Sequence, residues 1–406
     1  MSPRVHPPQP TLAFDHEPRT RLVCGHGTLD RAGELARELG GQRALLVTDP
    51  GLVAAGHADH ARTALTSAGL DVALYDGVRE NPTTLDVSRA VEAARAHQTD
   101  ILIGLGGGSA MDTAKGCNFL FTNGGEMRDY WGRGKATRPM LPLLAIPTTA
   151  GTGSECQSAA LIADEVTHQK MACLDPKAAA RIALLDPDLT LSQPFAVTAH
   201  TGVDALAHAL ETAVTRPRNP ISLKYSHAAF QRMVGAFPRV LANPQDRQAR
   251  GHMLLGAALA GLAIENSMLG AAHSCANPLT ARFNVVHGEA VGLMLPHVIR
   301  FNAAHDVDTR RAYAELASAP ELACVSDGVE AAVDALVETL EALLNTARIA
   351  PSLRDLGVTP AAVPELAAEA ARQWTAQFNP RPLDVGAFVK LFEAAFEPRR
   401  PGIAHV

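Results

Sequence analysis

The stretch that decides the fold is residues 101–116, "ILIGLGGGSAMDTAKG", in which an apolar run leads through three glycines into a helix-like segment. An unbroken apolar run of this length is typical of a strand buried on both faces of a parallel sheet. Gly106, Gly107 and Gly108, followed by Ser109, come where that strand ends, and open α/β sheets bind ligands at this edge. A backbone without Cβ atoms can close on a phosphate there, although a plain tight turn would use the same residues.

Strand and helix patterns alternate on both sides of this stretch, which indicates βαβ units. The runs with the length and composition of strands are 43–48, 71–75, 100–105, 141–147, 159–163, 169–174 and 181–185. The segment after the first run is expected to form a helix that ends at about Gly69. From residue 197 onward only helical periodicity is present, as in residues 329–344. We therefore expect an α/β domain at 1–193 and an all-helical domain at 194–406.

A second polar loop, "PTTAGTGSE" at 147–155, also follows an apolar strand. Thr148, Thr149 and Thr152 supply hydroxyls, and the glycines between them supply clearance. Two such loops suggest sites for the pyrophosphate and nicotinamide ends of a dinucleotide. Asp49, at the end of the run 43–48, either accepts the ribose hydroxyls of NAD, which would disfavour NADP, or caps the next helix. The glycine loop does not come first here, as it does in the usual Rossmann order.

Histidines and one acid in the second half suggest a metal site. In "TAHTGVDALAHALETAV", residues 198–214, Asp204 and His208 are four apart and share a helix face, but His200 competes for that face. His273 and His287 follow, and we expect Pro278 to break the helix between them, so that they lie on separate elements. One carboxylate and three imidazoles suit a divalent metal. Local hydrogen bonds within a buried core are the alternative interpretation.

The composition is that of an ordinary soluble globular protein, with 47% hydrophobic and 19% charged residues. The net charge of -6 argues against a nucleic-acid or acidic-membrane partner. The N-terminus lacks the apolar segment of a signal peptide, so we expect a cytoplasmic protein whose six cysteines are reduced thiols. Glu265 and Asn266 interrupt the most apolar stretch, 253–272, which therefore predicts a buried helix rather than a membrane span.

Taken together, the motifs make the sequence similar to the iron-dependent (group III) alcohol dehydrogenases. The matching segments, which occur in the family's order, are "GLGGGSAMDTAKG", "IPTTAGTGSE", "TGVDALAHALE", "HGEAVGLMLPHVIRFN", "RIAPSLRDLGV" and "NPRPLD". The resemblance extends over roughly residues 20–396. It implies a dehydroquinate synthase-like fold, with an N-terminal dinucleotide-binding domain, a helical C-terminal domain and an active site in the cleft between them. It also implies a homodimer or larger homo-oligomer.

The resemblance also implies roles for individual residues. Asp204, His208, His273 and His287 take the metal-ligand role, which decides the contest with His200 in favour of His208. The metal implied is Fe(II), with Zn(II) as the alternative. The NAD contacts implied are Asp49, Asn81, Gly107, Gly108, Ser109, Thr148, Thr149, Thr152 and Lys170. The implied chemistry is hydride transfer between nicotinamide and a small alcohol or aldehyde, whose oxygen the metal polarises.

The chain departs from the family pattern in "HSCANPLT", residues 273–280. Many relatives carry a second histidine where this chain has Asn277. In the family that histidine is not a ligand but points to the substrate, and is thought to form a hydrogen bond or relay a proton. An amide cannot titrate, so we expect the proton route and the substrate preference to differ here.

Two other functions are alternatives for this architecture. A dehydroquinate synthase-like lyase would need several basic residues for its substrate, and the motifs of the expected cleft lack them. A catalytically silent NAD-binding assembly protein is the other alternative, and the four retained ligand residues argue against it.

Overall fold

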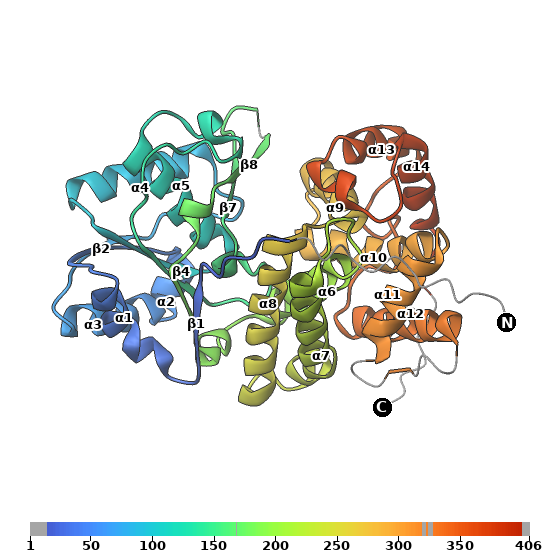
Figure 1. The fold of residues 1–406 in the computed structure, drawn as a ribbon, viewed down its shortest axis with the longest axis horizontal. Helices are drawn as coiled ribbons and strands as arrows, with labels where there is room; N and C mark the ends of the chain where they lie inside the picture. The colour runs from blue at the N-terminus through green and yellow to red at the C-terminus, as the bar shows by residue number, and fades with distance from the viewer. Residues whose placement is uncertain (1–13, 168, 319–321, 324–327, 400–406) are drawn as a thin grey trace. The chain divides into compact units, whose positions relative to one another are not determined.

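The first half of the chain forms a six-stranded parallel sheet in the computed structural model, which describes residues 14–167, 169–318, 322–323 and 328–399. In spatial order the strands are β1 (Arg21–Cys24), β9 (Ile182–Leu185), β6 (Leu143–Pro147), β4 (Ile101–Gly106), β2 (Arg43–Val47) and β3 (Asp71–Tyr75). Every pairing between neighbours is parallel (Figure 1). The predicted α/β fold with a parallel sheet is therefore confirmed.

Helices cover both faces of this sheet. They are α1 (Ala32–Glu38), α2 (Pro50–Ala54), α3 (His57–Ser67), α4 (Thr84–Ala96) and α5 (Gly108–Asn123). Successive strand residues point to opposite faces, so that Leu45 packs in the core under α4 and α5, whereas Leu46 packs in the core with α1 and α3. Burial on both sides explains why the strands read as continuous apolar runs.

Two local features of this half differ from the sequence pattern or add to it. The single helix expected to end at about Gly69 is two helices, α2 and α3, because Gly56 adopts a left-handed conformation (φ +81°) between them. A second, smaller sheet has the order β5 (Gly132–Arg133), β8 (Lys170–Leu174) and β7 (Ala159–Ala163), with β7 and β8 antiparallel.

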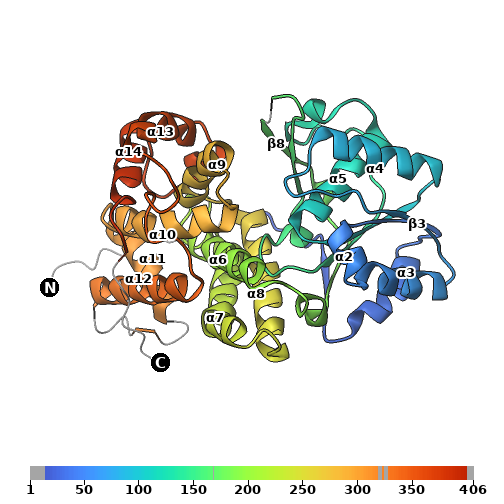
Figure 2. The ribbon, with the colours of Figure 1, turned by 180° about the vertical axis from the view of Figure 1, so that it is seen from behind.

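The second half of the chain is helical throughout the part that the structure describes (Figure 2). Its helices are α6 (Phe195–Thr212), α7 (Pro220–Ala242), α8 (Arg247–Ser267), α9 (Ala271–Phe283), α10 (His287–Ala303), α11 (Val307–Ser318), α12 (Val329–Thr346), α13 (Val363–Ala371) and α14 (Val385–Ala394). Short 3-10 turns join some of them, including η8 (Trp374–Phe378). The predicted helical C-terminal half is confirmed.

The expected helix break at Pro278 is wrong. Helix α9 continues through this proline to Phe283, and the chain turns at Asn284, which adopts a left-handed conformation (φ +54°). Asparagine is one of the few residues that tolerates this conformation after a helix end. Residue 287 then begins α10, so the two histidines do lie on separate helices, but the break comes after Phe283.

A close approach of two helices fixes where α10 begins. A Cβ atom added to Gly288 would lie 2.0 Å from the carbonyl oxygen of His200 on α6, so only glycine allows this contact. The contact brings the first turn of α10 against α6 and so places His287 beside Asp204, which lies on α6.

By its contacts the chain divides into two compact units, one of residues 17–193 and one that contains residues 194–399. Residues 14–16 group with the helical unit, where His16 forms a hydrogen bond with the side chain of Asn266 at 3.0 Å.

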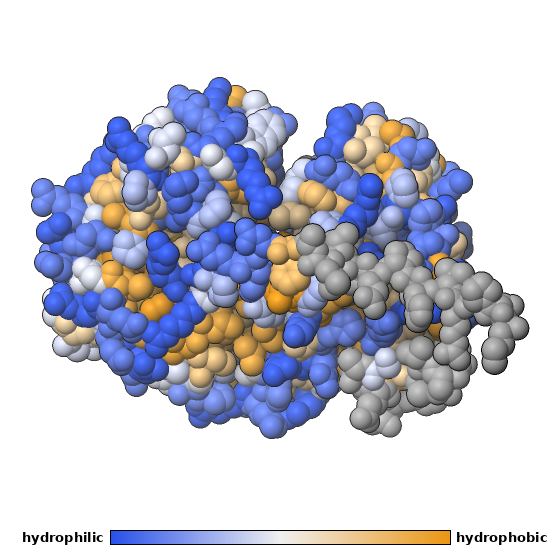
Figure 3. Space-filling model, in the orientation of Figure 1, coloured by the Kyte–Doolittle hydropathy of each residue, from blue (hydrophilic) through white to orange (hydrophobic). Residues whose placement is uncertain are grey.

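Hydrophilic residues cover much of the face in Figure 3, with smaller apolar patches between them. No single described helix is long and apolar enough to cross a membrane, and α8 and α9 pass that test only as a pair bent by 105°. The five cysteines within the described residues are free thiols, as expected, and Cys324 lies outside those residues.

Candidate functional site

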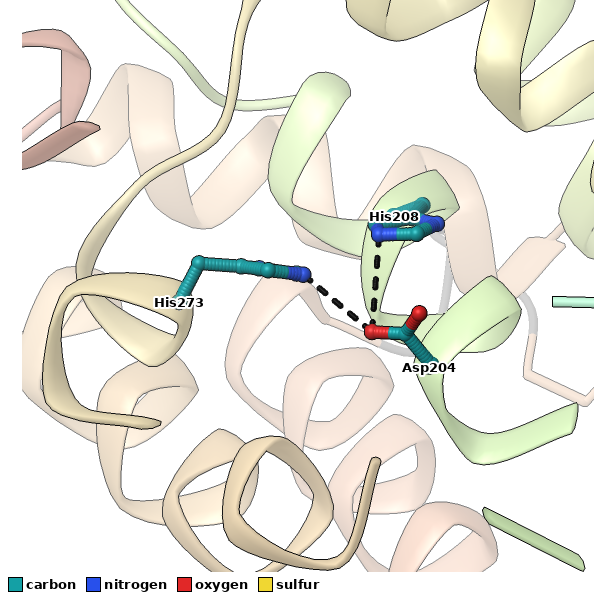
Figure 4. Close-up of side chains that lie close together, drawn as sticks. All are labelled: Asp204, His208 and His273. Atoms are coloured by element: carbon teal, nitrogen blue, oxygen red, sulfur yellow. Dashed lines mark hydrogen bonds and ion pairs between the residues drawn. The ribbon is translucent and has the colours of Figure 1, made fainter. Parts of the chain in front are cut away.

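Three buried side chains of the helical unit converge on one point (Figure 4). Asp204 and His208 lie one turn apart on α6, and His273 comes from the first turn of α9. Asp204 Oδ1 lies 3.4 Å from His208 Nε2 and 3.3 Å from His273 Nε2. One potential ligand atom from each residue lies within 4.8 Å of the others. The sequence-predicted face of α6 therefore carries a carboxylate that meets an imidazole from another helix.

His287 is the fourth predicted ligand and is more exposed than the rest. Its Nε2 lies 3.8 Å from Asp204 Oδ1, and 35% of its side chain is accessible, against 5% for His273. Its ring is tilted against that of His273, with centroids 5.5 Å apart. Three of the four predicted residues thus form the convergent group, and His287 lies beside it, near the shared carboxylate oxygen of Asp204. His200 is not part of the convergent group found among the described residues.

The electrostatics of the cluster favour a cation at its centre. Burial would raise the pKa of Asp204, but His208, His273 and His287 hold that pKa well below its usual range. Burial likewise lowers the pKa of His273, yet the carboxylates Glu211 and Asp204 raise it to about 9. The rings of His208 and His273 are stacked, with centroids 4.8 Å apart, so two imidazolium charges would repel each other there. Neutral imidazoles around a divalent metal, with one carboxylate, match this donor set.

Sequence reasoning missed a second buried carboxylate in this cluster, that of Glu211. Its Oε2 lies 2.6 Å from His273 Nδ1, on the side of the ring that faces away from Asp204. The signal was available, because Glu211 follows His208 by three residues and Asp204 by seven, and such positions share a helix face.

The two polar loops of the α/β unit lie against each other. Gly107 precedes α5 and Gly108 begins it, and a Cβ atom on Gly108 would lie 2.7 Å from Thr152 Cγ2. A Cβ atom on Gly107 would contact the side chain of Thr149 at 3.4 Å. Thr148 N donates to the carbonyl of Gly106 at 3.0 Å. The glycine and threonine loops thus form one surface at the carboxyl ends of β4 and β6.

Asp49 lies beside this surface, at the end of β2. One of its carboxylate oxygens accepts a hydrogen bond from Leu52 N at 3.1 Å and caps α2, as the capping interpretation predicted. The other lies 3.6 Å from where a Cβ atom on Gly106 would be. The predicted contact with a ribose remains a prediction, and the second oxygen leaves room for it.

Ser109 is half-buried at the start of α5, and Asn81 and Lys170 are exposed. Asn81 has a left-handed conformation (φ +53°) before α4, and Lys170 begins β8. Ala163, the residue paired with Lys170, donates its N–H to the carbonyl of Pro82 at 2.9 Å. Asn81 and Lys170 therefore lie on neighbouring stretches of backbone.

A buried polar network beneath the loops was also missed by sequence reasoning. The ammonium of Lys115 on α5 donates to the carbonyl of Ser154 at 2.6 Å, to its hydroxyl at 2.9 Å and to the carbonyl of Ala159 at 3.0 Å. The Ser154 hydroxyl in turn lies 3.0 Å from a carboxylate oxygen of Asp112. This network attaches the end of the threonine loop to α5.

Asn277 lies one turn after His273 on α9 and is half-buried. Its amide Nδ2 donates to Gln373 Oε1 at 2.9 Å, just before η8. Asn277 therefore pairs with a second amide side chain, and neither group titrates near neutral pH.

Comparison with known proteins gives a consistent result over nearly the whole chain. Residues 18–187 match the sequence model described as iron-containing alcohol dehydrogenase, and residues 198–396 match that of the C-terminal part of the Fe-containing alcohol dehydrogenase family. The chain is 35% identical to lactaldehyde reductase of Escherichia coli (strain K12) over 374 residues, which cover 92% of this chain and 97% of that enzyme. It is 31% identical to the NAD-dependent methanol dehydrogenase of Bacillus methanolicus, with 92% and 97% covered. A solved structure of 1,3-propanediol oxidoreductase is similar with a TM-score of 0.91 and 31% identity, over 95% of this chain and all of that one.

Proposed function

This chain belongs to the iron-containing alcohol dehydrogenase family and is an oxidoreductase that acts on CH–OH groups, and we propose that its reaction depends on both NAD(H) and a divalent metal. The resemblance predicted from the motifs is thereby confirmed. The observation that carries the metal proposal is the buried convergence of Asp204, His208 and His273, with His287 at 3.8 Å from the shared carboxylate oxygen.

The four residues would hold Fe(II) or Zn(II), and the loop residues of the α/β unit would hold the dinucleotide. When bound, the metal supplies a Lewis acid for an alcohol or carbonyl oxygen, and NAD supplies a hydride acceptor. Asp204 contributes the one anionic ligand, and its depressed pKa keeps it ionised for that role. The hydroxyls of Thr149 and Thr152, beside the glycines, are placed to hydrogen-bond a phosphate or amide group.

The preference for NAD over NADP rests on Asp49, whose carboxylate would repel a 2′-phosphate. The similarity to an enzyme described as an NAD-dependent methanol dehydrogenase supports this choice. We extend the proposal to the remaining predicted contacts, which are Asn81, Gly107, Gly108, Ser109, Thr148 and Lys170. The substrate is a small alcohol or aldehyde, and we further propose a cytoplasmic homodimer or larger homo-oligomer.

Asn277 distinguishes this chain within the proposed mechanism. Because its amide does not titrate near neutral pH and so cannot act as a general acid or base, proton transfer to solvent would use water or another side chain. The hydrogen bond to Gln373 holds the amide in one orientation and leaves its carbonyl oxygen as an acceptor for a polar substrate.

The experiment that tests the proposal uses the full chain, stripped of metal and reloaded with Fe(II) under anaerobic conditions or with Zn(II). NAD reduction is followed with primary alcohols of increasing length and with small diols, and NADH oxidation with the matching aldehydes. We expect turnover that requires the metal and prefers NAD to NADP. Absence of turnover with every alcohol and aldehyde, in protein shown by elemental analysis to hold metal, would contradict it.

A further inference from the structure

The carboxylate of Glu211 contacts both the ring of His273, a predicted metal ligand, and the backbone N–H groups at the start of α9. We propose that Glu211 is a positioning residue for the metal centre, which fixes both the ring orientation and the proton placement of His273. This inference rests on the proposed function, since it presupposes that the Asp204 cluster binds a metal.

Glu211 receives three hydrogen bonds in a buried setting. Its Oε1 accepts from Ala272 N at 2.6 Å, and its Oε2 accepts from Gly270 N at 3.0 Å and faces His273 Nδ1 at 2.6 Å. Only 3% of the side chain is exposed. These contacts connect α6 to the first turn of α9, although 62 residues of sequence separate Glu211 from His273.

The bonding pattern decides which nitrogen of His273 carries a proton. An ionised carboxylate can only accept hydrogen bonds, so the ring nitrogen Nδ1 must be the donor in the 2.6 Å contact. In the neutral imidazole the other nitrogen, Nε2, then has a free lone pair, and this nitrogen lies 3.3 Å from Asp204 Oδ1. Glu211 thus selects the tautomer that can donate a lone pair to a metal beside Asp204.

The local sequence of α9 makes this carboxylate necessary. The residue before the helix is Gly270, which has no side chain to cap the first N–H groups, so acceptors must come from elsewhere. Glu211 accepts from two of these groups, and Asn379 Oδ1 accepts from a third, that of Ala271, at 3.2 Å. A Cβ atom on Gly270 would lie within 3.2 Å of both acceptor side chains. Glycine at this position therefore lets both acceptors reach the helix end.

Asn379 provides a matched control. It satisfies the same helix end and lies in a buried amide network with Asn302, to which its side chain donates at 2.8 Å. Its hydrogen bonds reach Ala271, Asn302 and Arg381 rather than the ring of His273. Removing Asn379 disturbs the start of α9, whereas removing the charge of Glu211 disturbs both the helix start and the histidine.

The test compares Glu211→Gln with Asn379→Ala in the full chain. A glutamine cannot accept all three hydrogen bonds, because one of the two terminal atoms becomes an NH2 donor. The dissociation constant for Zn(II) is measured by competition with a chromophoric chelator, and thermal unfolding of the metal-free protein is measured alongside. We expect E211Q to bind Zn(II) about 10–100-fold more weakly than the wild type, and N379A to bind with near wild-type affinity despite lower thermal stability.

The outcomes separate this inference from the proposed function. If the wild type binds no divalent metal, the metal site itself is wrong, and this inference falls with it. If the wild type binds Zn(II) and E211Q binds it equally well, or if N379A loses as much affinity as E211Q, Glu211 does not position the ligand and only this inference is overturned.

Should E211Q fail to fold, Glu211→Asp takes its place, because aspartate keeps the charge but withdraws the carboxylate by one methylene. The inference then expects weaker Zn(II) binding than in N379A and an altered visible spectrum of the Co(II)-loaded protein. An unchanged affinity and spectrum in E211D would overturn it.

Discussion

The two units of the chain each contain a buried cluster of charged side chains, and the clusters are built in opposite ways. In the α/β unit, Lys115 donates to the carbonyl and hydroxyl of Ser154 and to the carbonyl of Ala159, and the Ser154 hydroxyl donates to Asp112. In the helical unit, the ion pairs of Asp204 within the described residues are all with histidines. The first cluster contains its own hydrogen-bond donor, the Nζ of Lys115, whereas the second consists mainly of groups that offer lone pairs.

The two clusters differ in the direction in which the pKa of their buried acids is shifted. Burial raises the pKa of Asp112 in spite of the nearby Lys115, and it raises the pKa of Glu155, the next acid along the loop, to about 7. The pKa of Asp204 is depressed although this residue is buried too, because three imidazoles face it. A buried cluster whose donors and acceptors satisfy one another anchors the fold, whereas a cluster with excess lone pairs needs protons or a metal and can therefore do chemistry.

Removing the acid of the helical cluster is expected to give the largest effect. Asp204→Asn keeps the size of the side chain but removes the anionic ligand, so kcat/KM should fall by about 10³-fold or more as metal polarisation is lost. Steady-state kinetics and metal content by elemental analysis check this. His200→Asn, on the same helix but outside the cluster, should retain both metal and activity. Full metal retention by D204N would show that the Asp204 carboxylate is not needed as a metal ligand, and would contradict the proposed difference between the two clusters.

Removing the cation of the α/β cluster should instead cost stability. Lys115→Met leaves the buried carbonyl and hydroxyl of Ser154 and the half-buried carbonyl of Ala159 without their donor, which should lower the free energy of unfolding by about 3–5 kcal/mol. Urea unfolding of the metal-free proteins measures this loss, and added Zn(II) should stabilise the variant and the wild type by similar amounts. The matched control is Lys390→Met on an exposed part of α14, where a change within about 0.5 kcal/mol is expected. Equal losses for the two variants would show that Lys115 is not an anchor.

The sequence predicted the features of these clusters that depend on local pattern. Strands such as 43–47 and 101–106 are recognisable because burial on both faces leaves them apolar throughout. Asp204 and His208 are recognisable because a spacing of four puts both on one helix face. The approach of His273 was anticipated from chemistry and family resemblance, since no local pattern specifies which helices meet.

The features that were missed depend on contacts between distant residues. Lys115 and Glu211 read as ordinary polar residues of helices, and their buried partners lie 39 and 62 residues away in sequence. The error at Pro278 has a similar origin, because the loss of one helical hydrogen bond was offset by packing on both sides of α9. Helices α7 and α10 also continue through internal prolines, so in this unit tertiary packing outweighs the local rule.

A pH series on Glu155 sharpens the contrast between the buried acids. Its folded-state pKa of about 7 lies above its ordinary value of 4.5, so the folded protein holds this proton more tightly than the unfolded chain does. The sign is then fixed for this group: the contribution of Glu155 to stability is fully present below pH 4.5 and is lost as the pH rises through about 7, by about 3 kcal/mol in total. Glu155→Gln removes this loss, so the variant should be the more stable protein at pH 8 and should differ little at pH 5. Urea midpoints at the two pH values measure it, and a constant difference between the proteins at both would contradict the assignment.

The smallest expected effect concerns Asn277, which lies one turn from His273 yet bonds to Gln373 rather than to the cluster. If the role of Asn277 is limited to its hydrogen bond with Gln373, Asn277→Leu should lower the free energy of unfolding by about 1 kcal/mol, the value of one hydrogen bond. The dissociation constant for Zn(II) should stay at the wild-type value. Gln373→Leu should cost less in the N277L background than in the wild type, because the pair is then already broken. Additive losses of unfolding free energy in the double variant would show that the two amides do not stabilise each other. Weaker Zn(II) binding by N277L would show that Asn277 acts together with the metal ligands, so that the metal cluster extends to this amide.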